Sequence, residues 1–161
     1  MKIVLFHPDI PQNTGNIART CYLTQTGLVL IRPLGFSLSH RHLKRAALDY
    51  WNEISVELID DLASYLEKAP SFYFFSSKAT ARFTDVRYTE QSLLIFGSET
   101  NGLPHCFHEC WKENFVTIPM KPDARCLNLS NAVAVGLYEA LRQTHFAQFT
   151  FSENKRKEEI K

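Results

Sequence analysis

Short, continuous apolar runs recur along the chain and are separated by longer segments of helical character. Runs of this length that are rich in Val, Ile and Phe are typical of strands covered on both faces of a sheet. We therefore expect strands at residues 3–6, 28–31, 71–75, 92–96 and 115–118, and helices at residues 16–25, 39–48, 60–68, 104–113 and 130–143. This alternation predicts an α/β fold with a mostly parallel sheet.

The last predicted helix has the clearest periodicity. Ser130 is suited to cap its first turn. Ala134, Leu137, Tyr138 and Leu141 follow at the spacing of one apolar face of a helix. We expect these four side chains to pack on the sheet.

Three polar segments stand at strand ends, each leading into a predicted helix: residues 11–16, 97–104 and 125–131. In the second of them, Gly97 would let the backbone approach a ligand, Gly102 can take a positive φ, and Pro104 suits the first turn of a helix. Such a segment is also typical of a purely structural turn between strand and helix. The presence of all three favours a single binding site at which they converge.

Two common nucleotide-binding motifs are absent from the sequence, and this limits the kinds of ligand that we expect. No G-x-G-x-x-G follows the first strand, and no G-x-x-x-x-G-K-[ST] occurs, which argues against a Rossmann cofactor site and a P-loop. The segment 97–104 would suit an adenosine-like ligand, with backbone groups at the base edge. Phe75, Ile118 and Leu127 would close on its ring.

Composition fits a soluble globular protein, with 161 residues of which 45% are hydrophobic and 22% charged. We expect one domain at residues 1–151 and a frayed, dispensable charged tail at residues 152–161. No run could cross a bilayer and the chain opens directly on a strand, so we expect a cytoplasmic protein with no membrane partner. Four irregularly spaced cysteines indicate reduced thiols, and the net charge of +1 neither demands nor excludes nucleic acid.

Arginine and lysine side chains supply two candidate anion contacts. Arg19 follows the first polar segment and could grip a phosphate or stabilise an oxyanion, although a solvated helix residue would look the same. Arg41, Lys44 and Arg45 would lie along one side of a helix. They could bind an RNA backbone or form an ordinary solvated face.

A group of histidines and cysteines after the second polar segment does not predict a metal site. On a helix, Cys106 and Cys110 share one face, whereas His105 and His108 share another. No second cluster completes a tetrahedral set, so we expect no metal. Cys126, beside the third segment, would be a nucleophile only with a base nearby, and otherwise a small wall residue.

The chain resembles the SPOUT ribose methyltransferases in their three ordered motifs. These lie at residues 13–19, at residues 96–104, and at residues 118–120 together with 127–134. The resemblance extends over residues 2–143. Residues 45–51, and the lack of an added RNA-binding domain, are similar to the branch that methylates the wobble cytidine or uridine of bacterial leucine tRNAs. Methylation of ribosomal RNA, or RNA and cofactor binding without catalysis, remain the alternatives.

The resemblance implies a deep C-terminal trefoil knot that binds S-adenosylmethionine, and a homodimer that receives tRNA where the subunits meet. It implies a cofactor pocket made of Phe75, Ser76, Gly97, Glu99, Asn101, Gly102, Leu103, Ile118, Met120, Cys126, Leu127 and Ser130. At the position of Cys126, relatives often have serine.

The resemblance also implies a catalytic role for Arg19 and Asn13. A guanidinium is always protonated and makes a poor base. We therefore expect Arg19 to stabilise the developing alkoxide of the ribose 2'-hydroxyl, with the proton passing to a phosphate oxygen or to water. Methyl transfer would convert the donor into S-adenosylhomocysteine.

Overall fold

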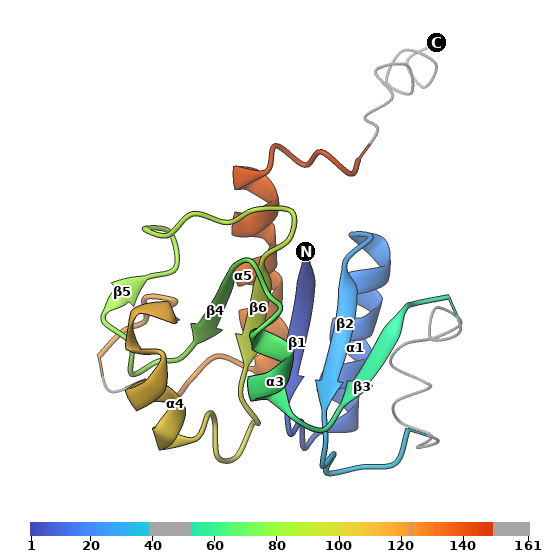
Figure 1. Cartoon of the computed structure of the whole chain (residues 1–161), viewed down its shortest axis with the longest axis horizontal. Coiled ribbons are helices and arrows are strands. Elements are labelled where there is room, and N and C mark those ends of the chain that lie inside the picture. The colour runs from blue at the N-terminus through green and yellow to red at the C-terminus, as the bar shows by residue number, and fades with distance from the viewer. Residues whose placement is uncertain (39–52, 123, 150–161) are drawn as a thin grey trace.

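The computed structural model describes residues 1–38, 53–122 and 124–149. Within these residues, seven strands form one sheet in the order β3-β2-β1-β6-β4-β7-β5 (Figure 1). Every pair of neighbouring strands is parallel. The strands are β1 (Lys2–Phe6), β2 (Gly27–Ile31), β3 (Val56–Ile59), β4 (Phe72–Phe75), β5 (Ala81–Arg82), β6 (Leu93–Phe96) and β7 (Phe115–Thr117). The prediction of an α/β fold with a mostly parallel sheet is confirmed.

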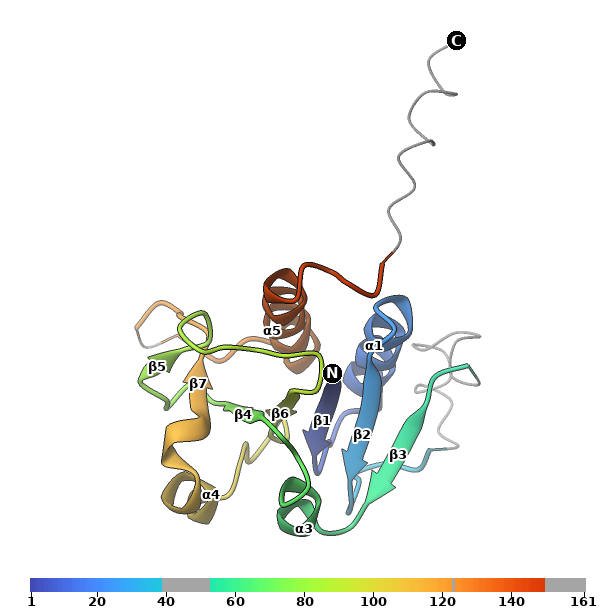
Figure 2. The same ribbon diagram turned by 45° about the horizontal axis from the view of Figure 1, so that its top comes forward.

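Helices cover both faces of the sheet, with α1 and α5 on one face and α3 and α4 on the other (Figure 2). Their bounds are α1 (Pro11–Leu23), α3 (Leu62–Leu66), α4 (His105–Cys110) and α5 (Leu129–Gln143), and a 3-10 turn, η2 (Lys112–Asn114), follows α4. None of the helices in the described ranges has the length and apolar character of a membrane span.

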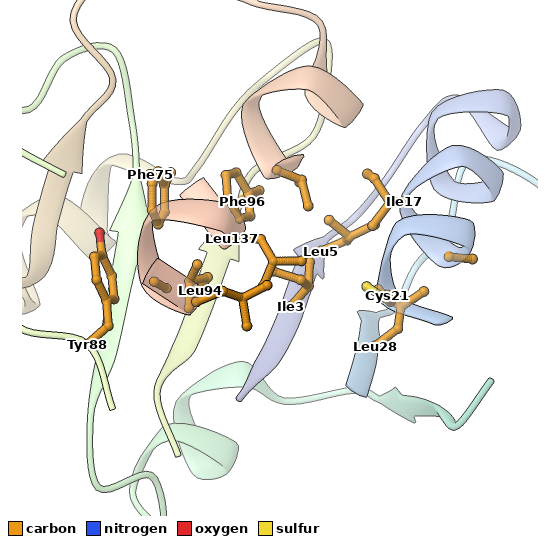
Figure 3. Packing of buried hydrophobic residues seen from close by; sticks show 14 of the residues in the cluster. Ile3, Leu5, Ile17, Cys21, Leu28, Phe75, Tyr88, Leu94, Phe96 and Leu137 are labelled. Carbon is orange, nitrogen blue, oxygen red and sulfur yellow. The ribbon is translucent and has the colours of Figure 1, made fainter. Parts of the chain in front are cut away.

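The two faces of the sheet carry separate hydrophobic layers because successive side chains of a strand point in opposite directions. Ile3 and Leu5 of β1 pack with Ile17 of α1 and Leu137 of α5 (Figure 3). Val4, between them in sequence, belongs to the opposite layer under α3 and α4. This double coverage explains the nearly continuous apolar runs of the central strands.

The start of α1 corrects one prediction. We expected a polar loop over residues 11–16 and a helix from residue 16, but the helix begins at Pro11. Proline suits this position because its fixed φ is helical and its missing N–H would have no helical partner there. Asn13 and Thr14 are consequently buried helix residues.

The start and the packing of α5 correct two further predictions. Asn128, not Ser130, is the N-cap, and its side chain accepts a hydrogen bond from the Ser130 N–H. Tyr138 is 52% exposed, so it does not join Leu137 and Leu141 in the core. The buried stripe includes Gly136, where a Cβ would lie only 2.7 Å from the Phe75 ring.

Both edge strands of the sheet escaped prediction. β3 contains Glu57 and has no fully buried residue, and the two residues of β5 are exposed, so neither strand forms the continuous apolar run of a central strand. The predicted helix at residues 39–48 and the predicted tail at residues 152–161 lie outside the described residues.

Candidate functional site

The segments that follow the carboxyl ends of β1, β6 and β7 surround one cavity. In a parallel sheet these ends lie at one edge, which is where α/β proteins bind ligands. The cavity has a volume of about 620 Å³, within the usual range for small-molecule sites. The predicted convergence of three polar segments is confirmed.

A chain of side-chain hydrogen bonds ties the three segments together. The Asn13 Nδ2 donates to Glu99 Oε1 at 2.8 Å. The Asn13 Oδ1 accepts from Asn128 Nδ2 at 2.9 Å. The Asn128 Oδ1 in turn accepts from the Ser130 N–H at 2.9 Å and from its hydroxyl at 2.7 Å. One buried asparagine on α1 therefore fixes the loops after β6 and β7 relative to each other.

Asp9, which sequence analysis missed, secures the loop after β6 from the other side. Its N–H donates to Glu99 Oε2 at 2.8 Å, so both carboxylate oxygens of Glu99 are engaged by the β1 side of the site. The Asp9 carboxylate accepts from the N–H and the hydroxyl of Thr100. Its position just after β1 was the signal that could have identified it.

The loop after β6 folds back on itself and needs both of its glycines. Ser98 and Gly102 exchange two backbone hydrogen bonds of 3.2 and 3.0 Å. Gly102 has a φ of 68°, and a Cβ on Gly97 would lie 2.5 Å from the Gly102 oxygen and 2.6 Å from the Leu103 nitrogen. The predicted positive φ of Gly102 is confirmed, whereas Gly97 makes room for the returning backbone of its own loop.

Apolar side chains form the opposite wall of the cavity. Phe75 stacks on Phe96 with ring centroids 4.5 Å apart. Ile118 and the 41% exposed Leu127 line the same space. A cavity with a polar loop on one side and aliphatic and aromatic groups on the other suits a flat heterocycle that carries polar edges.

Charged groups at the cavity are mainly cationic. Its cationic side chains are Lys78 and Arg125, which sequence analysis missed, and His108 also lines it. The pKa of His108 is lowered, first by burial and then by the nearby His105 and Lys78, which favours the neutral ring. Glu99 lies among them with its carboxylate held by Asp9 and Asn13.

The structure brings most of the predicted pocket residues to this cavity. Its lining includes Asn13, Phe75, Ser76, Gly97, Glu99, Asn101, Gly102, Leu103, Ile118, Met120, Cys126 and Leu127. Ser130 does not line it and acts through Asn128. Arg19 lies on the exposed face of α1 and does not line it either. Arg41, Lys44 and Arg45 lie outside the described residues.

The cysteine and histidine candidates occupy separate surroundings. Cys126 is exposed, and its Sγ lies 3.4 Å from the Ser77 hydroxyl, to which it donates. His105 pairs with Glu109 on the surface, whereas His108 stacks on Phe115. Across residues 1–38, 53–122 and 124–149, no three His, Cys, Asp or Glu residues are grouped as metal ligands.

Comparison with known proteins agrees with this geometry. The sequence matches the SpoU rRNA Methylase family over residues 1–138. A tRNA (cytidine(34)-2'-O)-methyltransferase from Methylovorus glucosotrophus is 43% identical over 148 residues, which cover 90% of this chain and 96% of that protein.

Solved structures share the fold. One described as giving structural insights into the 2-OH methylation of C/U34 on tRNA is 43% identical, with a TM-score of 0.83 over 89% of this chain and 95% of that one. The SpoU methyltransferase AviRb from Streptomyces viridochromogenes, in complex with the cofactor AdoMet, has a TM-score of 0.79 at 21% identity and is covered over 58% of its length. From the extent of the family match and these identities, the chain belongs to the SpoU rRNA Methylase family.

Proposed function

We propose that this protein transfers a methyl group from S-adenosylmethionine to the ribose 2'-hydroxyl of the wobble nucleotide of tRNA, C34 or a modified U34, in the cytoplasm. The observation that carries the proposal is the cavity that Asn13 organises by bonding to both Glu99 and Asn128. The relatives named for methylation at this tRNA position, similar over most of their length, support it.

The residues present fit the methyl donor. Adenosine offers a flat ring for the apolar wall of Ile118 and Leu127, and polar edges for the backbone of the loop after β6. The cationic Lys78 and Arg125 at the same cavity suit the carboxylate end of the methionine part. When bound, the donor supplies an electrophilic methyl group next to a positive sulfur.

The protein's own side chains then have to hold the ribose 2'-hydroxyl in line with the methyl group of the donor. They also have to stabilise the 2'-oxygen as it loses its proton. Holding the two reacting groups in the right geometry supplies a large part of the rate enhancement in such a transfer. Asn13 keeps the loops after β6 and β7 in place through its bonds to Glu99 and Asn128. Arg19, on the exposed face of α1, is assigned to the developing alkoxide and the adjoining phosphate of the RNA.

This assignment requires a homodimer, because Arg19 does not line the cavity of its own chain. We propose that the outer faces of α1 and α5 form the interface. Leu23, Val135 and Tyr138 are 55%, 42% and 52% exposed on these two helices, which lie side by side (Figures 1 and 2). Arg19 would then face RNA bound at the cavity of one or the other protomer.

We also propose that the C-terminal segment forms a deep trefoil knot. Residues 125–128 line the same cavity as the loop after β6 before the chain enters α5. Threading of this segment through a preceding loop would hold the cavity closed on three sides.

Ribosomal RNA is the second candidate substrate, since the matching family is described by rRNA methylation. One experiment separates the two. The protein is incubated with labelled methyl donor and either undermodified total tRNA or ribosomal RNA, and the labelled nucleotide is mapped by nuclease digestion. Label on the 2'-oxygen of a wobble nucleotide, with leucine tRNAs as the expected acceptors, supports the proposal. Label confined to ribosomal RNA would contradict it.

A further inference from the structure

A second cavity, of about 390 Å³, lies on the far side of the loop after β6 from the donor cavity. Both cavities are lined by Ser98, Asn101 and Gly102, so this loop is the wall between them. On the other side, the second cavity is bounded by the ends of β1 and β2. A group held there therefore lies next to the donor cavity.

The lining of this second cavity has an aromatic end and a polar end. Phe6 and His7 stack with ring centroids 3.8 Å apart and planes 20° from parallel. Leu34 adds an aliphatic surface. Asp9 and Asn101 supply carboxylate and amide groups.

His7 has an unusual backbone conformation that fixes the position of its ring. His7 has a φ of 48°, in the left-handed region that non-glycine side chains rarely adopt. Its N–H donates to the Ile31 oxygen at 3.2 Å, which fixes the residue against the end of β2. Such conformations cluster at functional sites.

We propose that this second cavity receives the base of the nucleotide whose ribose is methylated, with the base stacked on His7. The inference rests on the proposed function and adds a recognition site to it. Protein aromatic rings bind unstacked RNA bases in this way. Carboxylate and amide oxygens such as those of Asp9 and Asn101 accept hydrogen bonds from the amino group of cytosine. The shared loop puts the attached ribose at the boundary between the two cavities.

The test compares two tRNAs that differ only at the target nucleotide, which is a cytidine or an abasic ribose. Binding and methyl transfer are measured for the wild type and for His7→Gly, which removes the ring at a φ that suits glycine. His7→Phe keeps a flat ring, and His105→Ala, at a surface residue outside both cavities, is the matched control.

The wild type, His7→Phe and His105→Ala are expected to bind the cytidine tRNA at least about fivefold more tightly than the abasic one, the lower end for stacking of one base. For His7→Gly the ratio should approach one, with unchanged binding of S-adenosylhomocysteine. Equal ratios in the wild type and His7→Gly, with methyl transfer intact, would overturn the base site and leave the proposed function standing. No methyl transfer by the wild type to the cytidine tRNA would overturn both.

Discussion

Asn13 donates a hydrogen bond to Glu99 at 2.8 Å across a separation of 86 residues, and both side chains line the donor cavity. Asn13 is only 6% exposed, and its other amide atom accepts from Asn128. An amide side chain can donate to a carboxylate from its nitrogen while its oxygen accepts from a second amide. The pair therefore joins the start of α1 to the loop after β6.

Replacing Asn13 by aspartate tests this relationship. The new carboxylate would lie against Glu99, and two carboxylates in contact cannot both ionise without cost. We expect the free energy of unfolding to fall by about 2–3 kcal/mol at pH 8. The deficit should shrink as the pH falls to 5, because a proton shared by the pair is favoured in the folded state.

Urea denaturation at both pH values measures that deficit. Asn16→Asp, at an exposed residue on the same helix, is the control and should change stability little at either pH. A deficit for Asn13→Asp that is the same at pH 5 and pH 8 would show that the two carboxylates do not interact.

The two glycines of the loop after β6 should respond very differently to alanine. At Gly97 the new Cβ would collide with the backbone of Gly102 and Leu103. We therefore expect the free energy of unfolding to fall by an amount at the upper end of about 1–3 kcal/mol, and cofactor binding to weaken. At Gly102 nothing lies within 4 Å, and only the positive φ is penalised, by about 1 kcal/mol. Thermal denaturation of both variants gives the comparison, and equal losses would be inconsistent with this loop conformation.

Arg19→Ala should separate catalysis from folding. Because Arg19 is exposed, its removal is expected to change the free energy of unfolding by no more than about 0.5 kcal/mol. Methyl transfer to tRNA should fall by about 100-fold, as for loss of one group that stabilises an oxyanion. Arg87→Ala, at another exposed arginine, is the control. Activity of Arg19→Ala within a few-fold of the wild type would remove Arg19 from the mechanism.

The four free cysteines provide a chemical probe of the site. Burial raises the pKa of the Cys21 thiol to about 12, and only thiolates react readily, so Cys21 should stay unmodified by iodoacetamide in the native protein. Cys126, which lines the cavity, should be protected by S-adenosylhomocysteine. Exposed Cys106 lies outside the lining and should react at the same rate with or without it.

Peptide mass spectrometry over a time course gives each rate separately. Equal modification of Cys126 in the presence and absence of S-adenosylhomocysteine would place the ligand elsewhere.

The central strands and the convergence of the three polar segments could be predicted because burial on both faces leaves a continuous apolar run and parallel strands end at one edge. The edge strand β5 could not, since two exposed residues carry no such pattern. The start of α1 was misplaced because Asn13, Thr14 and Gly15 favour loops, and only their burial against the sheet makes them helical.

Two features of the structure, one in the site and one on α5, depend on tertiary structure alone. The role of Asp9 comes from its distance to Glu99 and Thr100, which are 90 and 91 residues away in the chain. The position of Tyr138 depends on how α5 is rotated, since it is one residue from the buried Leu137. Local sequence does not determine either.

The central claim is that the cavity joined by Asn13, Glu99 and Asn128 binds the methyl donor. Isothermal titration of the folded protein with S-adenosylhomocysteine tests it most directly. We expect saturable binding at one site per chain in the wild type, and much weaker binding in Gly97→Ala. The absence of binding heat at several temperatures, in protein shown by circular dichroism to be folded, would contradict the account.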